Sequence, residues 1–416
     1  MNPGRLPPYT DTMNEQQYDL IIVGGGMVGA TLAIALSGHG LKLALVEAAE
    51  PRVEAVPNYD DRAIALAYGA QRIFQALGLW PELARRAAPI RHIHVSEQGG
   101  FGIAHLDAEE EAVPALGQVI TARDLGEVLL ARLARLDDLD LIAPARVRWA
   151  AVADDLARVG LDDERQLTAP LLVAADGGDS FIRDHLGFVV ERRAYHQSAL
   201  VANVTPGRPH GDTAYERFTA QGPLALLPMP GDRCGLVWTL ADENLDQHLA
   251  LDDDSFLARL QAAFGWRLGR FQKVGRRAGY PLQQLLVPET VKPRVAVIGN
   301  AAHTLHPVAG QGFNLGIRDL AVLAEVVLDA HRAGQDPGSE AVLDRYRQWR
   351  QQDQQRVARL TDGLVRLFSN RWPPLRLGRN LGLLGLELCP PARHRIARTA
   401  MGLEGRLPRL ARGLPL

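Results

Sequence analysis

Short apolar runs alternate with a helical pattern near the start of the chain. Residues 19–24 and 41–47 are apolar runs of strand length, and residues 27–36 between them place apolar side chains at helical spacing. Gly38 and Gly40 end the helical pattern. Because a buried strand, a helix and a second buried strand follow one another closely, this segment predicts a βαβ unit of a parallel sheet.

Later segments show a second pattern before the first returns. Residues 171–177 and 295–298 are again short apolar runs, and residues 315–332 form a helical pattern with one apolar face. Residues 195–280 instead alternate in a strand-like way between Gly, Pro and Asp turns. The chain therefore predicts an α/β fold, a Rossmann-like domain with an inserted antiparallel-sheet domain. The strands expected in the inserted sheet are residues 199–204, 214–219, 224–228 and 234–239.

The first apolar run ends in a glycine turn of the form GxGxxG. Gly24 permits a tight turn, Gly26 lets backbone N–H groups approach a diphosphate, and Gly29 lets the helix pack closely on the strand. Glu47 ends the second strand, where a carboxylate accepts hydrogen bonds from ribose hydroxyls. The alternative is a glycine turn without a ligand and an exposed glutamate. The candidate cofactor contacts of this turn are Gly24, Gly26, Met27, Val28 and Gly29.

A second strand, turn and helix begins at Gly299. Two such turns indicate one extended dinucleotide held at both ends, with its reactive ring at the second turn, which points to a flavin. Glycines let N–H groups approach a ring edge, and the following helix places the positive end of its dipole there. Asn300 can donate to and accept from ribityl hydroxyls, although an ordinary turn needing glycines for its shape is the alternative. The candidate ring contacts are Pro307, Gly310, Gln311 and Gly312.

Three further polar residues lie where they can reach the same cofactor. Arg62 follows the second strand and is a candidate diphosphate contact, with a surface salt bridge as the alternative. Gln118 and Arg123 lie near the start of a helix predicted over residues 124–133 and have the same two interpretations. Sequence position alone does not decide between the two.

Composition excludes several classes of function. The formal net charge of −2 gives no basic field for nucleic acid. Only Cys234 and Cys389 are present, without metal-ligand spacing, so a reducing, cytoplasmic setting is expected. His303 and His306 are spaced as a metal pair but lack a third ligand, so we expect no metal site. No nucleophile-histidine-acid motif, P-loop lysine or second βαβ fingerprint occurs, so NADH or NADPH is expected to bind without a domain of its own.

The two ends of the chain differ from its middle. Residues 1–16 are polar and contain proline, which predicts a loose extension without a signal sequence, with Met13 as a possible alternative start. No apolar run reaches membrane-spanning length. From Leu364 onward, ten arginines and only two glutamates are interleaved with leucines. This helical tail either lies on an anionic membrane surface, docks a partner protein, or packs as a cap with its arginines reaching solvent.

Together these motifs resemble the single-component flavoprotein aromatic hydroxylases, which share the para-hydroxybenzoate hydroxylase fold. More narrowly, the chain resembles the ubiquinone-biosynthesis hydroxylases, and within them the 2-polyprenyl-6-methoxyphenol hydroxylase branch. The resemblance covers about residues 18–402. The segments that carry it, beyond the glycine turns and the Asp176-Gly177 strand end, are residues 215–219, 222–228, 236–238, 264–269 and 367–373.

The resemblance implies roles for individual residues. Gly24, Gly26, Gly29 and Glu47 would bind the ADP half of FAD, Asp176 the flavin diphosphate region and passing NAD(P)H, and Asn300 the ribityl chain, although most of the class has aspartate at that position. It also implies that Pro307, Gly310, Gly312 and Asn314 surround the isoalloxazine. The implied domains are a discontinuous FAD-binding domain (17–85, 113–190 and 286–350), a substrate domain (86–112 and 191–285) and a C-terminal helical region (351–416).

The resemblance also implies the reaction. FAD reduced by NADH or NADPH reacts with O₂ to a C4a-hydroperoxide, whose distal OH is transferred to an electron-rich carbon of a polyprenyl phenol. No protein nucleophile is needed, so we assign no catalytic residue. An apolar site of the inserted sheet would hold ring and tail, and its candidate residues are Phe218, Leu226, Met229 and Trp238.

Three alternatives remain: hydroxylation of another ring position, hydroxylation of a soluble aromatic substrate, and a flavin-binding structural subunit of a quinone-biosynthesis complex. Hydroxylation of a polyprenyl phenol in ubiquinone biosynthesis implies a cytoplasmic protein in peripheral contact with the inner membrane and with other ubiquinone-biosynthesis proteins.

Overall fold

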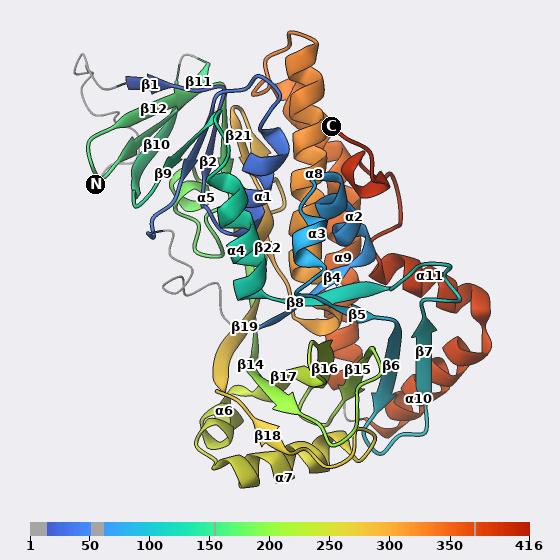
Figure 1. The fold of residues 1–416 in the computed structure, drawn as a ribbon. Coiled ribbons are helices and arrows are strands. Elements are labelled where there is room, and N and C mark those ends of the chain that lie inside the picture. The colour runs from blue at the N-terminus through green and yellow to red at the C-terminus, as the bar shows by residue number, and fades with distance from the viewer. Residues whose placement is uncertain (1–14, 51–61, 154, 370–371) are drawn as a thin grey trace.

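A six-stranded sheet forms the centre of the upper part of the molecule (Figure 1). The computed structural model describes residues 15–50, 62–153, 155–369 and 372–416. All neighbouring strands of this sheet are parallel except for β20 and β21. In spatial order the strands are β20 (Val291–Lys292), β21 (Val295–Val297), β13 (Leu171–Ala174), β2 (Leu20–Val23), β3 (Leu43–Val46) and β9 (Leu139–Ile142).

Both faces of this sheet are covered, which explains its continuous apolar runs. Leu20 and Ile22 of β2 pack with the helices on one side, whereas Ile21 and Val23 belong to a second core on the other side. The helices on the first side include α1 (Met27–Leu36), α4 (Ala122–Leu133) and α8 (Gln311–Arg332). The predicted βαβ unit and the predicted Rossmann-like domain are therefore confirmed.

The second core lies under a smaller sheet that the apolar pattern did not predict. Its strands are β1 (Glu15–Gln17), β12 (Gln166–Ala169), β11 (Leu156–Leu161) and β10 (Val147–Ala153), and α5 (Phe181–His185) lies beside it. The expected loose extension is wrong for residues 15 and 16, because Glu15–Gln17 pairs in parallel with residues 166–168. Residues 1–14, including Met13, lie outside the described residues.

A nine-stranded sheet forms the lower part of the molecule (Figure 1). The four strands predicted in the insertion are confirmed, although the first is part of a much longer strand. The helices α6 (Asp242–Leu249) and α7 (Asp253–Phe264) contribute to the apolar core on one face of the sheet. The strands are β22 (His303–Thr304), β19 (Ala278–Leu286), β14 (Glu191–Thr205), β17 (Arg233–Ala241), β16 (Pro223–Met229), β15 (Thr213–Phe218), β6 (His92–Glu97) and β7 (Ile103–Asp107), with β18 (Lys273–Val274) beside β14.

A three-stranded sheet lies between the two larger ones. It consists of β4 (Ala63–Ala67), β8 (Gly117–Thr121) and β5 (Ala88–Ile90). The helices α2 (Tyr68–Ala76) and α3 (Trp80–Leu83) lie between β4 and β5 in the chain. Val119 and Ile90 pack with Met229 and Ala214 of the nine-stranded sheet. This shared apolar cluster connects the two parts of the molecule.

The chain ends in helices, as its arginine-leucine pattern predicted. They are α9 (Glu340–Ser369), α10 (Pro373–Leu388) and α11 (Pro390–Ala400), and short 3₁₀ turns occur at η1 (Gly299–Ala301), η2 (Val308–Gly310) and η3 (Leu410–Arg412). Helix α10 packs on β7 and β6, where its Arg379 and Asn380 bind the carboxylate of Glu97 at 2.5 and 2.6 Å. In the described ranges, no helix is long and apolar enough to cross a membrane.

Candidate functional site

Four strand ends meet at one edge of the six-stranded sheet. Strands β21, β13, β2 and β3 are neighbours and parallel, so the turns that follow them converge. A Cβ atom at Gly24 would lie 2.4 Å from the carbonyl oxygen of Ala175 and 2.7 Å from Cα of Asp176. The first glycine turn and the Asp176 strand end are therefore in direct contact.

The glycines of the first turn have two different environments. A Cβ at Gly29 would lie 2.0 Å from the carbonyl oxygen of Gly24, so this position requires glycine for close packing. A Cβ at Gly26 would meet no atom of the described residues within 4 Å. Helix α1 begins directly after Gly26 and has no acidic residue in its first turn. The open space therefore faces unshielded N–H groups, which suits an anionic diphosphate.

The Glu47 carboxylate is held against this turn. Its Oε2 accepts a hydrogen bond of 2.6 Å from the N–H of Gly25, and its Oε1 accepts one of 2.9 Å from Ala49. A carboxylate has about four acceptor positions, so capacity remains for ribose hydroxyls. Gly25 was not among the predicted site residues, although its position inside the GxGxxG motif indicated that it belongs to the turn.

Asp176 has a buried oxygen that suits a hydroxyl donor. Its Oδ2 accepts a hydrogen bond of 3.2 Å from the N–H of Ile182. Its Oδ1 is buried and has no hydrogen-bond donor among the described residues. Burial raises the pKa of this carboxyl, and a Cβ at the following Gly177 would meet nothing within 4 Å. A cofactor hydroxyl at this position would satisfy the orphan oxygen.

The second glycine turn packs against the first. Gly299 has a φ of +60°, and a Cβ there would lie 3.2 Å from the side chain of Val28, two residues into α1. A Cβ at Gly316 of α8 would also approach Val28 and Gly299 at 3.2 Å. Asn300 extends an exposed side chain from this turn. The structure thus brings together both turns, which lie more than 250 residues apart.

The loop before α8 is shaped for close approach by a ligand. Pro307 precedes the 3₁₀ turn η2, and Gly310 adopts a left-handed conformation at the helix N-cap with a φ of +60°. A Cβ at Gly312 would meet no atom within 4 Å. Helix α8 has no acidic residue in its first turn. Its N–H groups and dipole can therefore stabilise negative charge on a ring edge.

The side chains of two predicted ring contacts, Asn314 and Gln311, form hydrogen bonds within the protein. The Asn314 amide accepts a hydrogen bond from Ala67 N–H and donates to the carbonyl oxygens of Ala65 and Gly310, all at 2.8 Å. Gln311 donates to the carbonyl oxygen of Ala400 at 3.3 Å. Both side chains are buried. Asn314 therefore joins α8 to β4, and its side chain supports the loop.

Arg62, Gln118 and Arg123 lie on or beside the three-stranded sheet. The Arg62 guanidinium lies 4.8 Å from the ring centre of Tyr280 in β19, and the Arg62 carbonyl oxygen accepts a hydrogen bond from Ala122 N–H. Arg62 and the exposed Arg123 thus flank the start of α4. Gln118 is half-buried on β8. Because Ala65 of β4 lies against Gly310, this sheet borders the loop before α8.

A buried ion network behind the second turn was not predicted. His303 Nε2 lies 2.5 Å from one carboxylate oxygen of Asp319, and Arg350 donates to the other at 2.7 Å. Burial alone would raise the pKa of Asp319, but attraction from Arg350 and His303 holds it at about 2. Asp319 is a charged residue within an otherwise apolar face of α8, and this pattern could have predicted a buried charge with a partner. No group of three potential metal-binding side chains occurs in the parts of the chain that are described.

The predicted substrate residues divide between two faces of the nine-stranded sheet. Leu226 and Trp238 are buried in the core that includes α7, so they lie on the side away from the three-stranded sheet. Met229 packs with the three-stranded sheet, and the ring of Phe218 stacks on Phe368 of α9 at 3.5 Å between centres. Among the four candidates, only Phe218 and Met229 are on the side that faces the rest of the molecule.

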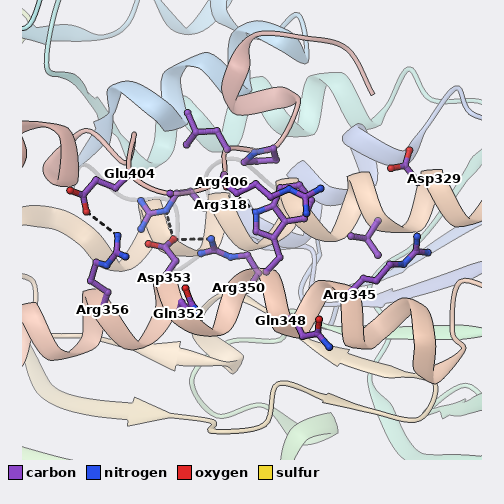
Figure 2. Close-up of a pocket in the computed structure, with 15 residues that line it drawn as sticks. Arg318, Asp329, Arg345, Gln348, Arg350, Gln352, Asp353, Arg356, Glu404 and Arg406 are labelled. Carbon is purple, nitrogen blue, oxygen red and sulfur yellow. Dashed lines mark hydrogen bonds and ion pairs between the residues drawn. The ribbon is translucent and has the colours of Figure 1, made fainter.

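A cavity of about 400 Å³ lies elsewhere, between α8, α9 and residues 404–408 (Figure 2). Arg318 is paired with Asp353, and Arg356 with Glu404, each at 2.9 Å. The other charged lining residues are Arg345, Arg350, Arg406 and Asp329, so arginines outnumber carboxylates in this cavity. None of its lining residues belongs to a glycine turn, so it is separate from the site at the strand ends.

Comparison with known proteins agrees with this geometry. Residues 17–361 match the family model described as FAD binding domain. The ubiquinone hydroxylase UbiL of Rhodospirillum rubrum is 40% identical, with 100% of this chain and 97% of the relative covered. The 3-demethoxyubiquinol 3-hydroxylase of Escherichia coli is 32% identical, with coverage of 94% and 100%.

Solved structures show the same fold. The p-nitrophenol 4-monooxygenase PnpA of Pseudomonas putida has a TM-score of 0.78 at 20% identity, with coverage of 95% of this chain and 100% of that chain. PqsL of P. aeruginosa, in complex with 2-aminobenzoylacetate, has a TM-score of 0.74 at 26% identity, with coverage of 89% and 100%. FAD is thus the cofactor of this chain. The chain belongs to the family of FAD-binding monooxygenases that includes the ubiquinone hydroxylases.

Proposed function

We propose that this protein hydroxylates the aromatic ring of a polyprenyl phenol in ubiquinone biosynthesis, using NADH or NADPH and O₂. The observation that carries the proposal is the convergence of two glycine turns and the Asp176 strand end at one sheet edge, beside the face of an inserted sheet. Relatives that match nearly the whole chain are named as ubiquinone hydroxylases. Full-length similarity supports transfer of the reaction class.

The residues at the strand ends fit FAD. The space beside Gly26 would take the diphosphate, Glu47 the adenosine ribose, and Asp176 and Asn300 the hydroxyls near the ribityl chain. The loop from Pro307 to Gly312 would border the flavin ring. When bound, the flavin carries electrons from the nicotinamide to O₂ and delivers one oxygen atom to the substrate ring. The protein orients the two molecules and keeps water from the reacting atoms.

Purified protein loaded with FAD tests this function. With 2-farnesylphenol we expect NAD(P)H and O₂ to be consumed and a ring-hydroxylated product to appear by mass spectrometry. A Gly26→Trp variant, whose side chain would fill the diphosphate space, should lose FAD and activity together. FAD-loaded protein that forms no hydroxylated product with any prenylated phenol would contradict the proposal. Retained pathway flux in cells carrying only Gly26→Trp would favour a structural role instead.

The surface of α10 further supports contact with an anionic membrane. Leu377, Leu381, Leu384 and Leu388 are all exposed, and their spacing of four, three and four residues places them along one side of the helix. Helices α10 and α11 lie at the outer edge of the lower part of the molecule (Figure 1). The exposed side chain of Trp372 precedes α10. An apolar stripe of this kind suits the lipid interface, from which a prenylated substrate would enter.

Charge distribution favours a lipid surface over an apolar protein partner. Arg395 and Arg398 are exposed on α11, and Arg376 is exposed beside the leucines. We expect the protein to sediment with phosphatidylglycerol vesicles and less with phosphatidylcholine vesicles. A Leu381→Ser/Leu388→Ser variant should lose this binding, whereas Val189→Ser, at an exposed valine outside α10 and α11, should not. Equal sedimentation of both variants would contradict membrane contact through α10.

A further inference from the structure

One row of residues crosses the inserted sheet on the side opposite to α7. The strand register pairs Glu216 of β15 with Val95 of β6 and with Ala225 of β16. Ala225 pairs in turn with Val237 of β17, and Val237 with Val201 of β14. Paired residues share a face of the sheet, and all five are half-buried. Glu216 is the only ionisable side chain in this row, which we call the open row.

The neighbouring row of residues, on the other face of the sheet, is buried. Tyr215 pairs with Leu226, and Leu226 with Leu236, and all three belong to the buried core that includes α7. Arg217, next to Glu216 in the chain, also points to that side and donates to the carbonyl oxygen of Ala263 in α7. Strand alternation therefore turns Glu216 away from α7 and toward the cofactor-binding part of the molecule.

The open row begins close to the loop before α8. Ala214, two residues before Glu216 on the same face of β15, packs in the apolar cluster that includes Ala65 of β4. A Cβ at Gly310 would lie 3.2 Å from Cβ of Ala65. Two residues along a strand span about 7 Å. Glu216 is thus the next residue on the same face of β15 after Ala214, whose cluster borders the expected flavin ring.

The environment of Glu216 is apolar on the other side as well. Phe218, two residues further along β15, is stacked on Phe368 of α9. Among the described residues, the Glu216 carboxylate has no hydrogen-bond or ion-pair partner. Burial raises the pKa of this carboxyl to about 7. Charged groups on this face include Glu97, the strand partner of Phe218, and Arg379 of α10, which are paired with each other.

We propose that Glu216 accepts the proton of the phenolic hydroxyl while the substrate ring is hydroxylated, an inference that rests on the proposed function. As the O–H bond breaks, its electron pair moves into the ring, and a ring carbon forms a bond to one oxygen atom of O₂. The O–O bond breaks at the same time, and the second oxygen atom leaves as water with two protons. That carbon then loses its hydrogen to water as a proton. The ring becomes aromatic again as the carbonyl oxygen takes back the proton held by Glu216. NAD(P)H supplies the two electrons that balance the reaction.

The chemistry explains why an unpaired carboxylate would be kept on this face. A phenol has a pKa near that of tyrosine, about 10, so it is largely neutral at physiological pH. A base is most effective when its own pKa lies near the working pH. Ala225, the strand partner of Glu216, has a small side chain. The valines of the open row would contact the apolar part of the substrate.

The kinetic test compares Glu216→Gln with Glu243→Gln, a change at an exposed glutamate on α6. For wild type and Glu243→Gln, kcat/KM for hydroxylation of 2-farnesylphenol should rise through about pH 7 and level off. For Glu216→Gln, it should be ~100-fold lower at pH 7 and rise toward pH 10, as the phenol ionises in solution. A Glu216→Gln profile that matches wild type would overturn the proposal.

A binding test keeps the inference separate from the proposed function. At pH 8, FAD-loaded wild type should bind 2-farnesylphenol at least ~10-fold more tightly than its O-methyl ether, because only the phenol donates to the carboxylate. Glu216→Leu should bind both equally. If wild type shows this preference but forms no product, the proposed function fails and the assignment of Glu216 stands. If wild type binds phenol and ether equally, the assignment fails whether or not product forms.

Discussion

The two glycine turns lie side by side at one edge of the six-stranded sheet but are stabilised in different ways. The first, after β2, depends on backbone packing, since Gly24 and Gly29 leave no room for a Cβ atom. The second, after β21, is supported by side chains: the Asn314 amide bonds to β4, and His303, Asp319 and Arg350 form a buried network. In both turns one glycine, Gly26 or Gly312, borders open space. Glycines of one motif thus serve two purposes, close packing and ligand access.

This contrast predicts that the second turn is the more sensitive to loss of a charge. Arg350→Met should lower the free energy of unfolding by about 3–5 kcal/mol, because it removes a cation from the buried Asp319. The pKa of Asp319 is held at about 2, below its unfolded value. The stabilisation is therefore present above about pH 4 and lost as the pH falls toward 2. Denaturant unfolding between pH 2 and 7 measures both effects.

A matched control lies three residues earlier on the same helix. Arg347 pairs with Asp344 at 2.8 Å, and both side chains are partly exposed. Arg347→Met should cost less than about 1 kcal/mol. Equal losses for the two variants would show that burial of the network does not support the second turn.

The two kinds of glycine in the first turn should respond differently to one added methyl group. Gly29→Ala should destabilise the protein without FAD by about 2–3 kcal/mol, because the Cβ would overlap a backbone oxygen that cannot move aside. Gly26→Ala should change stability by less than about 0.5 kcal/mol but weaken FAD binding by ~10-fold, about 1.4 kcal/mol. Calorimetry of the FAD-free protein and FAD titration separate these effects. If the two FAD-free variants were equally stable, Gly29 would not be required for packing more than Gly26 is.

Asp176→Asn should have a smaller effect than Arg350→Met or Gly29→Ala, and the opposite sign. Burial raises the pKa of this carboxyl, so the charged form destabilises the folded protein at pH values above its pKa in the unfolded chain. The amide can still accept from Ile182 N–H. Asp176→Asn should therefore stabilise the FAD-free protein by roughly 1 kcal/mol at pH 7, with the gain shrinking as the pH falls below the raised pKa of the folded state and absent below about 4. Thermal unfolding at several pH values would show a loss instead if the charge were favourable.

Local patterns predicted the cofactor-binding elements well. The GxGxxG turn, its helix and the strand ends near Glu47, Asp176 and Gly299 are each specified by neighbouring residues, and strand adjacency then brings them together. The side-chain network was missed because His303, Asp319 and Arg350 meet only in the tertiary structure. Their sequence separation is not a helical or strand period.

The apolar pattern did not separate the two faces of the inserted sheet, for a physical reason. Leu226 and Met229 are both apolar and buried, although they face opposite sides of the inserted sheet. When both faces of a sheet are covered, apolar character no longer shows which face contacts the ligand. The register was needed to separate the two faces. It places Glu216, which lies in the family-like segment 215–219, on the same face as Met229.

Hydrogen exchange with and without FAD tests most directly whether one cofactor spans both turns. We expect FAD to slow amide exchange in residues 24–29 and in residues 308–314 together, whereas ADP should protect only the first segment. The exchange rates of α7, on the far side of the inserted sheet, should not change with either ligand. Protection by FAD of the first turn alone would contradict the account, because the second turn would then not bind the flavin ring.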